Sequence, residues 1–241
     1  LNAQLFEYAV PYLYCTVGLI YNTDVIDLGG STDPKDVWGV LFNPEYVDRI
    51  GMYDSMRESI GAALNYLGYS LNTMDPAELA EAKALLIRQR QEVRPITGID
   101  ELKDKYVSGE LVAGIAWSGD YQVCLDKLSE ENAPDTNLAY VLPKGSNFAI
   151  DFMCIPANAQ HKAEAERFID FMCRPDIALK NAEYVLYSSP NLEVVPQLPE
   201  ELRNDPSFYP DGETLASLEV FFSNEEIEET YARIWEEVTG N

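Results

Sequence analysis

Short apolar segments rich in β-branched and aromatic residues alternate along this chain with amphipathic segments of helical period. The strand-like segments cover 8–22, 111–117, 138–143 and 148–156. Such alternation is typical of α/β proteins, in which helices cross over between largely parallel strands. With 241 residues, 46% of them hydrophobic, the chain can form one large domain or two lobes around a real core.

Capping residues mark several of the predicted helices. Ser55 and Glu58 have the spacing of a capping box. Asp75 is a predicted N-cap with Pro76 at the first helical position, and Pro175 is expected to end a helix. The predicted apolar faces are Ile60, Ala63, Leu64 and Leu67; Ala165, Phe168, Ile169 and Met172; and Ile227, Tyr231, Ile234 and Trp235.

The charge balance limits the possible partners. The chain has 17 Lys and Arg against 41 Asp and Glu, a formal net charge of −24. This potential repels phosphate backbones and anionic lipid and attracts small cations, so no nucleic-acid partner is expected. Much of the charge could equally serve solubility alone.

Metal and membrane chemistry are not indicated. The four cysteines, Cys15, Cys124, Cys154 and Cys173, show no CxxC spacing, and His161 is the only histidine, so no zinc site and no cofactor are predicted. The cysteines could be buried small hydrophobes or could pair outside the cell. No apolar run approaches the length of a membrane helix, and "LNAQLFEY" lacks a basic leader and an initiator Met. We therefore expect a soluble, mature or trimmed product.

The run "FAIDFMCIP" (148–156) has the composition of a buried strand, yet it has one carboxylate in its middle, Asp151. A carboxylate in apolar surroundings stays ionised at low cost only if a cation neutralises it. The chain must supply a partner for this charge, or the cation comes from outside the chain. The alternative is an Asp at a strand end or one that accepts hydrogen bonds from backbone amides.

Several stretches together resemble the spermidine/putrescine-binding proteins of bacterial ABC importers, a branch of the two-lobed solute receptors. They occur in family order from end to end: "VPYLYCTVGLIYN", "LNYLGYSLNTMDPAEL", "KYVSGELVAGIAWSGD", "YVLPKGSNFAIDFMCIPANAQHKAEAERFIDFMCRPDIA", "AEYVLYSSPN" and "LPEELRNDPSFYPDGETL". The resemblance implies an α/β, two-lobed, periplasmic-binding-protein-like (type II) architecture.

The resemblance also implies a domain organisation. Residues 1–15 would be the crossing strand and a remnant of lobe 1, 16–147 lobe 2, 148–190 the returning part of lobe 1, and 191–241 a helical segment that packs across the lobes. Most of the family's N-terminal lobe would precede Leu1. A lobe without its partner would expose strand edges near 8–20 and 148–156, so we also expect possible self-association.

The matching motifs imply five ligand-binding residues. A polyamine needs carboxylates for its ammonium groups and aromatic faces for the methylene chain between them. Asp151 matches the family acid that receives an amine, Trp117 matches a tryptophan that packs on the ligand, and Tyr187 matches a tyrosine that contributes a hydroxyl and ring. Glu58 matches a second carboxylate, and Ser55 occupies a position that is often another acid.

Each position also has a purely structural interpretation, and the family pattern is not complete. Trp117 could be core, Glu58 a capping residue, and Tyr187 a turn residue packed on the preceding helix. Ala149 stands where the family usually has Trp, and Phe221 where some relatives have a polar residue. These departures, together with Ser55, could change the preferred polyamine or indicate a different ligand.

The function implied is that of an extracytoplasmic receptor, free in the periplasm or tethered by lipid at the outer face of the membrane. Ligand would enter a cleft, closure would trap it, and the closed form would dock on an ABC permease. No bond is broken, so we expect no enzymatic activity. This chain by itself is expected to bind polyamine weakly, at millimolar concentration or below detection.

Other functions remain open from the sequence. A hydrolase would need paired carboxylates or a nucleophile motif, and neither GxSxG nor a Gly-rich phosphate loop is present. A receptor for an amino acid would need a cleft arginine, but Arg57 is turned away from Glu58 by helix periodicity. A receptor for another small cation and a fragment that binds nothing are the remaining alternatives.

Overall fold

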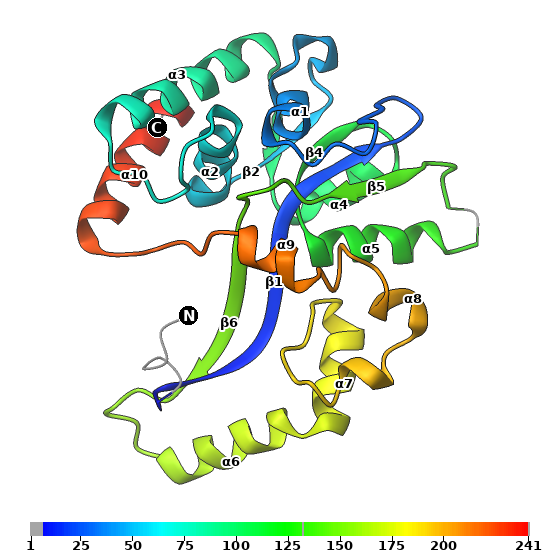
Figure 1. The fold of residues 1–241 in the computed structure, drawn as a ribbon, viewed down its shortest axis with the longest axis vertical. Helices are drawn as coiled ribbons and strands as arrows, with labels where there is room; N and C mark the ends of the chain where they lie inside the picture. Colours follow the sequence, from blue (N-terminus) through cyan, green and yellow to red (C-terminus); the bar gives the residue numbers. More distant parts are fainter. Residues whose placement is uncertain (1–6, 132, 241) are drawn as a thin grey trace. The chain divides into compact units, whose positions relative to one another are not determined.

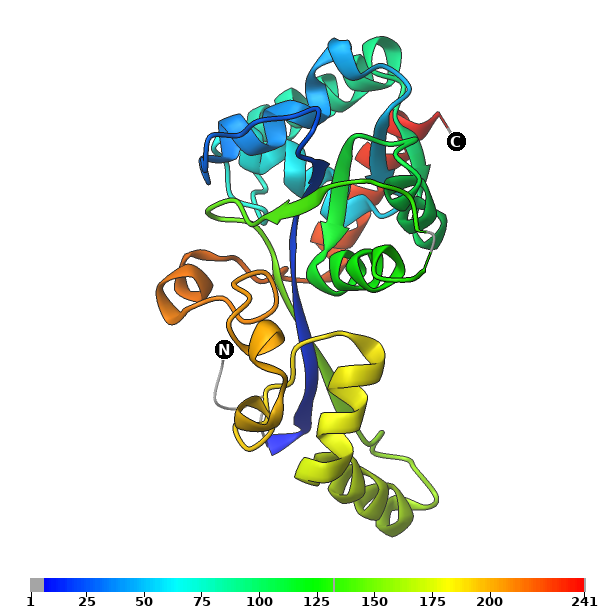
Figure 2. The same cartoon turned by 90° about the vertical axis from the view of Figure 1, so that its right-hand side faces the viewer.

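The computed structural model describes residues 7–131 and 133–240, which divide into two compact units (Figures 1 and 2). Unit 1 comprises the described part of Leu1–Cys15 together with Ala149–Pro210, and unit 2 comprises Thr16–Phe148 and Asp211–Asn241 as far as they are described. The predicted segment 191–241 is therefore shared between the units at Pro210. That these units correspond to the two lobes of the family stays a prediction.

A mixed sheet forms the centre of unit 2, and two of its strands, β1 and β6, have residues in both units. Its strand order is β3-β2-β4-β1-β5, and β6 also pairs with β1. The strands are β1 (Ala9–Asn22), β2 (Ile50–Tyr53), β3 (Ile96–Gly98), β4 (Ala113–Trp117), β5 (Leu138–Val141) and β6 (Phe148–Cys154). β2 runs parallel to β3 and to β4, whereas β1 runs antiparallel to β4 and to β5.

The prediction of largely parallel strands is thus right for β2, β3 and β4 and wrong for β1. Crossover helices determine the relative direction of the strands that they join. β1 precedes the first such helix, so the alternation of helices and strands in the sequence carries no information about its direction. By contrast, the four predicted strands themselves are confirmed, and they appear as β1, β4, β5 and β6.

Seven helices of the described part of the chain belong to unit 2. They are α1 (Pro34–Gly39), α2 (Met56–Leu67), α3 (Pro76–Glu92), α4 (Asp100–Val107), α5 (Ser118–Leu128), α9 (Gly212–Ser217) and α10 (Glu225–Thr239). The Asp75 carboxylate caps α3 by accepting from the amides of Ala77 and Glu78, as predicted. Trp38, Tyr53, Tyr106 and Tyr231 are the largest fully buried side chains of the core.

Unit 1 has a smaller core. It contains β6, α6 (Lys162–Cys173), α7 (Pro175–Val185) and α8 (Glu200–Arg203), and its buried cluster consists of Ala178, Ala182, Val194, Leu198 and Phe208. Pro175 ends α6, as predicted, and also begins α7.

The apolar face predicted for α6 is present but only partly covered, because Ala165, Ile169 and Met172 are half-buried. As the structure describes it, α6 contains no buried residue, and Phe168 is 60% exposed. A helical period shows which residues share a face, but full burial requires a partner surface across the whole face, and the described part of unit 1 covers it only in part.

Close backbone packing between β2 and β4 gives a test of the core. A Cβ atom at Gly114 would meet the hydroxyl of Tyr106 and, at 2.5 Å, the carbonyl oxygen of Gly51. We expect Gly114→Ala to lower the free energy of unfolding by about 1–3 kcal/mol, because a packed core cannot absorb the extra atom. Urea unfolding followed by tryptophan fluorescence measures this change in unit 2, where Trp38, Trp117 and Trp235 all lie.

Gly212→Ala is the matched control, because a Cβ atom at Gly212 would meet no atom within 4 Å. Equal stability of the two variants would contradict the packing described for β2 and β4.

Candidate functional site

The carboxyl ends of the parallel strands in unit 2 bring three predicted site residues to one edge of the sheet. Register pairs Gly51 of β2 with Gly114 of β4, so the two strands end side by side. α2 begins just after β2, with Ser55 as its N-cap and Glu58 in its first turn, and Trp117 is the last residue of β4. Ligands of open α/β sheets bind outside this edge. The arrangement is thus suited to ligand binding.

Ser55 and Glu58 interact, but not as a capping box. The Ser55 hydroxyl donates a hydrogen bond to the Glu58 carboxylate, and in the described structure the Ser55 side chain accepts no backbone N–H of α2. The predicted capping box is therefore wrong in its geometry. The reason is that a hydrogen bond from the Ser55 hydroxyl to a carboxylate is stronger than one from a backbone amide of α2 to that hydroxyl, so the hydroxyl turns to Glu58. Both side chains remain half-buried.

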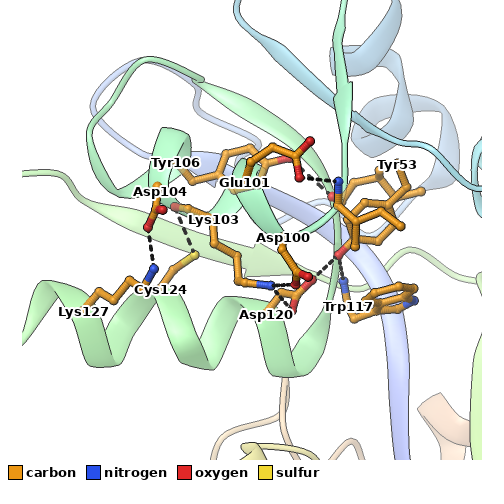
Figure 3. A network of polar contacts seen from close by, with 12 residues as sticks. Tyr53, Asp100, Glu101, Lys103, Asp104, Tyr106, Trp117, Asp120, Cys124 and Lys127 are labelled. Atoms are coloured by element: carbon orange, nitrogen blue, oxygen red, sulfur yellow. Dashed lines mark hydrogen bonds and ion pairs between the residues drawn. The ribbon is translucent and has the colours of Figure 1, made fainter.

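Trp117 contacts Tyr53, the last residue of β2, through its backbone and through its ring. The Trp117 backbone N–H donates to the Tyr53 hydroxyl oxygen at 2.8 Å, and the two rings lie 4.5 Å apart between centroids at an angle of 42°. Figure 3 shows this pair beside the start of α5. Trp117 is half-buried, and none of the described residues accepts a hydrogen bond from its indole. Neither full burial as a core residue nor full exposure describes it.

A buried polar network continues from Tyr53 into α5 and α4 (Figure 3). The Tyr53 hydroxyl donates to the Asp120 carboxylate at 2.5 Å. Lys103 reaches the other Asp120 oxygen at 3.2 Å and also binds Asp100 at 2.7 Å. Asp120 is only 8% exposed. The network therefore compensates a buried carboxylate with one cation and one hydroxyl.

Electrostatics in this network raise the pKa values of Tyr53 and Lys103. Burial, and then the charge of Asp120, raises the pKa of Tyr53 well above its usual value, so the phenol stays a donor. Burial by itself would lower the pKa of Lys103, but its bonds to Asp100 and Asp120 raise that pKa overall. Sequence reasoning missed these residues. The available signal was Asp120, an acid in the first turn of a helix that directly follows a buried strand.

Arg57 is committed to the interior of unit 2. Its guanidinium donates to the carbonyl oxygens of Phe222 and Leu71 and to the Asn72 side chain. It also lies over the ring of Phe221, 4.6 Å from the centroid, and over that of Tyr231 at 4.4 Å. Burial lowers the pKa of Arg57. An arginine with these contacts is not available to a ligand carboxylate, and Phe221 serves as its packing partner.

Asp151 lies in the middle of β6 in unit 1. The prediction that this strand is buried is wrong, because its residues are half-buried or exposed and the Asp151 side chain itself is exposed. Nevertheless, partial burial raises the pKa of the Asp151 carboxyl group, and no charged neighbour contributes to that shift. None of the residues that the structure describes donates a hydrogen bond to this carboxylate or forms an ion pair with it. Among the described residues, therefore, neither a cationic side chain nor a backbone amide stabilises the charge of Asp151.

Tyr187 lies where the chain of unit 1 returns to β1. It follows Leu186, whose left-handed backbone ends α7, and precedes Ser188. Ser188 pairs with Tyr14 through backbone hydrogen bonds of 2.9 and 3.1 Å. Tyr187 is half-buried. The structure thus places Ser55, Glu58 and Trp117 at one edge of the sheet in unit 2, and it places Asp151 and Tyr187 on separate elements of unit 1. Their roles as ligand-binding residues stay a prediction.

The described ranges 7–131 and 133–240 offer neither a metal site nor a membrane-spanning helix. In these ranges no three His, Cys, Asp or Glu side chains gather closely enough to hold a metal ion. None of the helices described there is both long enough and apolar enough to cross a membrane.

An α/β sheet with acidic and aromatic side chains at the carboxyl edge of its parallel strands places this chain in the α/β class, whose members bind ligands at that edge. Comparison with known proteins identifies the family. Residues 2–210 match the family described as bacterial extracellular solute-binding protein. The chain belongs to this family.

Individual relatives share much of this chain. It is 36% identical over 213 residues to the spermidine/putrescine-binding periplasmic protein of Salmonella typhimurium, which covers 87% of this chain and 57% of that protein. A putative spermidine/putrescine ABC transporter protein from Listeria monocytogenes superimposes with a TM-score of 0.82 at 36% identity, over 97% of this chain and 69% of that one. The Streptococcus pneumoniae substrate-binding protein PotD, solved with calcium and HEPES, gives a TM-score of 0.80 at 34% identity, over 98% and 69%.

These comparisons confirm the predicted family and the predicted type of fold. The chain spans 57% of the length of the Salmonella relative that it matches. The ligand and the partners of this chain are therefore a matter for proposal.

The raised pKa of Asp151 is directly measurable. Carboxyl carbon NMR should give a titration midpoint for Asp151 above the usual Asp value, whereas the midpoint of Asp211, whose pKa is lowered by the Thr214 amide, should lie below it. Because the folded-state pKa is raised, Asp151 stabilises the fold most at low pH, and this contribution is lost as the pH rises through that pKa.

Asp151→Asn should accordingly be more stable than the natural chain at neutral pH, and the difference should vanish below the pKa of an unfolded Asp. A midpoint for Asp151 at or below that of Asp211 would contradict the environment described for β6.

Proposed function

We propose that this chain belongs to an extracytoplasmic solute receptor that binds a polyamine such as spermidine or putrescine and delivers it to an ABC permease. Membership in the extracellular solute-binding family supports the receptor role, and the names of the Salmonella and Listeria relatives support the ligand class. The net charge of −24 favours a cationic ligand. The proposed location is the periplasm or the outer face of the bacterial cell membrane.

The unpaired carboxylate of Asp151 carries the proposal. It lies between Ile150 and Phe152 in a strand, and none of the described side chains neutralises it. An ammonium group would supply the missing charge through charge-assisted hydrogen bonds. In unit 2, the half-buried indole of Trp117 offers an aromatic surface to a methylene chain or a second ammonium, with Glu58 and Ser55 at the same edge.

The proposed activity is binding and release, not catalysis. The family is one of solute-binding proteins, and the candidate residues are acids, aromatic rings and a hydroxyl without an adjacent general base. His161 stands at the exposed start of α6. Recognition by charge and ring contacts needs no cofactor.

A receptor of the same fold for a different small cation is the second candidate. Two departures favour it. Ala149 lacks the aromatic ring, and Phe221 lacks the polar group, that the family pattern has at these positions. An amino-acid ligand is less well supported, because Arg57 is engaged by three acceptors and two rings within unit 2.

The expected affinity of the 241-residue chain follows from the number of contacts. A charge-assisted hydrogen bond contributes about 1.5–3 kcal/mol and an exposed cation–π contact about 0.5–1 kcal/mol, whereas micromolar affinity needs about 8 kcal/mol after ordering costs. The chain spans 57% of its Salmonella relative, so we expect millimolar binding or none for the chain by itself.

Calorimetric titration tests this proposal. Putrescine, spermidine and a zwitterionic amino-acid control are titrated into the 241-residue chain and into a longer protein that adds the part of the Listeria relative that this chain does not cover. We expect tight polyamine binding only in the longer protein. There, Asp151→Asn should weaken the binding by about tenfold or more, because one charge-assisted contact is lost.

Asp170→Asn is the matched control, since Asp170 is another exposed acid of unit 1. Equal loss in both variants would point to overall charge instead of a site. A longer protein that folds and ignores every polyamine would overturn the polyamine proposal, and micromolar binding by the 241-residue chain would overturn the argument from contact number.

A further inference from the structure

Trp117 is bonded through its backbone to a chain of groups that do not belong to the predicted site. Its N–H donates to the Tyr53 hydroxyl oxygen, and the Tyr53 hydroxyl in turn donates to Asp120. Lys103 holds the second Asp120 oxygen and links it to Asp100. All these residues belong to unit 2. Figure 3 shows the bonds as one continuous network behind the indole.

The direction of these hydrogen bonds is fully determined. A tyrosine hydroxyl has one proton, which Tyr53 donates to Asp120, so only the lone pairs of its oxygen remain to accept from Trp117. Asp120 is held in place as the acceptor of that proton, because its other carboxylate oxygen accepts from Lys103 at 3.2 Å. A chain of aligned donors, each polarising the next, holds its members more firmly than isolated bonds do.

The network acts at the point where the strand changes into a helix. Trp117 ends β4 and is also the N-cap of α5, with an extended backbone of φ −71° and ψ 148°. Its N–H lies beyond the paired part of β2, so the Tyr53 hydroxyl replaces the strand carbonyl that is missing there. Asp120, in the first turn of α5, anchors the other end of that turn. The backbone that carries the indole is thus bonded on both sides of the bend.

We propose that Tyr53, Asp120 and Lys103 are positioning residues that fix the orientation of the Trp117 indole for ligand. The inference rests on the proposed function for its second part, the dependence of ligand affinity on this orientation. Its first part, the orientation itself, is independent of any ligand.

Tyr53→Phe separates positioning from packing. Phenylalanine keeps the ring that lies 4.5 Å from the indole and removes only the hydroxyl that accepts from Trp117 and donates to Asp120. Tyr231→Phe is the matched control. Tyr231 is equally buried in unit 2, and its hydroxyl contacts the carbonyl oxygens of Leu71 and Thr73.

The experiment labels the 241-residue chain with 5-fluorotryptophan and records fluorine NMR spectra during titration with spermidine up to millimolar concentration. The three signals of Trp38, Trp117 and Trp235 are assigned with Trp→Phe variants. In Tyr53→Phe without ligand we expect the Trp117 signal to shift and broaden while those of Trp38 and Trp235 stay. In the longer protein, where tight binding is expected, calorimetry should show the spermidine dissociation constant of Tyr53→Phe raised by about five- to tenfold, because the energy that the lost hydrogen bonds supplied to hold the indole must then come from binding. Tyr231→Phe should leave the Trp117 signal and the affinity unchanged.

The outcomes test the two parts of the proposal separately: the positioning of the indole and its effect on ligand affinity. An unmoved Trp117 signal in Tyr53→Phe overturns the positioning role. A moved signal with unchanged affinity overturns the link to ligand. If spermidine changes no signal in the natural chain and does not bind the longer protein either, the proposed function fails, and the ligand-free spectra still decide the positioning role. If Tyr53→Phe does not fold, Asp120→Asn serves in its place, because it keeps the size of the side chain and removes the charge that Lys103 pairs with.

Discussion

The strand β1 is the constraint on which both units depend. Its residues from Ala9 to Asn22 run continuously from unit 1 into unit 2. In unit 2 it pairs with β4 on one side and β5 on the other, and in unit 1 it binds the backbone of Ser188 through Tyr14. The N–H and C=O groups of a buried backbone need hydrogen-bond partners. A strand that pairs on both sides therefore fixes the register of its two neighbouring strands, here β4 and β5. The position of Trp117 at the end of β4 follows from this pairing.

Three acidic side chains of this protein differ in their burial and in their hydrogen-bond partners. Asp120 is buried and is compensated by Lys103 and Tyr53. Glu58 is half-buried and accepts from the neighbouring Ser55. Asp151 has neither kind of partner among the described residues, although its environment raises its pKa. A receptor for a cation needs some acids that are neutralised by the fold and others that await the ligand, because only the latter gain energy on binding.

Much of the secondary structure was predictable because local chemistry decides it. The N-cap of α3 at Asp75 with Pro76 after it, the end of α6 at Pro175 and the apolar stripe of α10 all follow from residues within one or two helical turns. The capping box at Ser55 failed, since the same two side chains can satisfy each other instead of the backbone. The network behind Trp117 was not predictable, because Tyr53 and Asp120 stand 67 positions apart and only strand pairing brings them together.

The sequence by itself determined the alternation of strands and helices, the acidic character, the candidate residues and, through the order of its motifs, the family. The antiparallel direction of β1, the exposure of Asp151 and of α6, and the commitment of Arg57 to the interior were decided only in the tertiary structure. The physical reason is the range of the interactions concerned. Helix and strand propensity and capping act between residues close in sequence. Strand direction, burial and charge compensation depend on contacts between residues that are far apart in sequence and close in space.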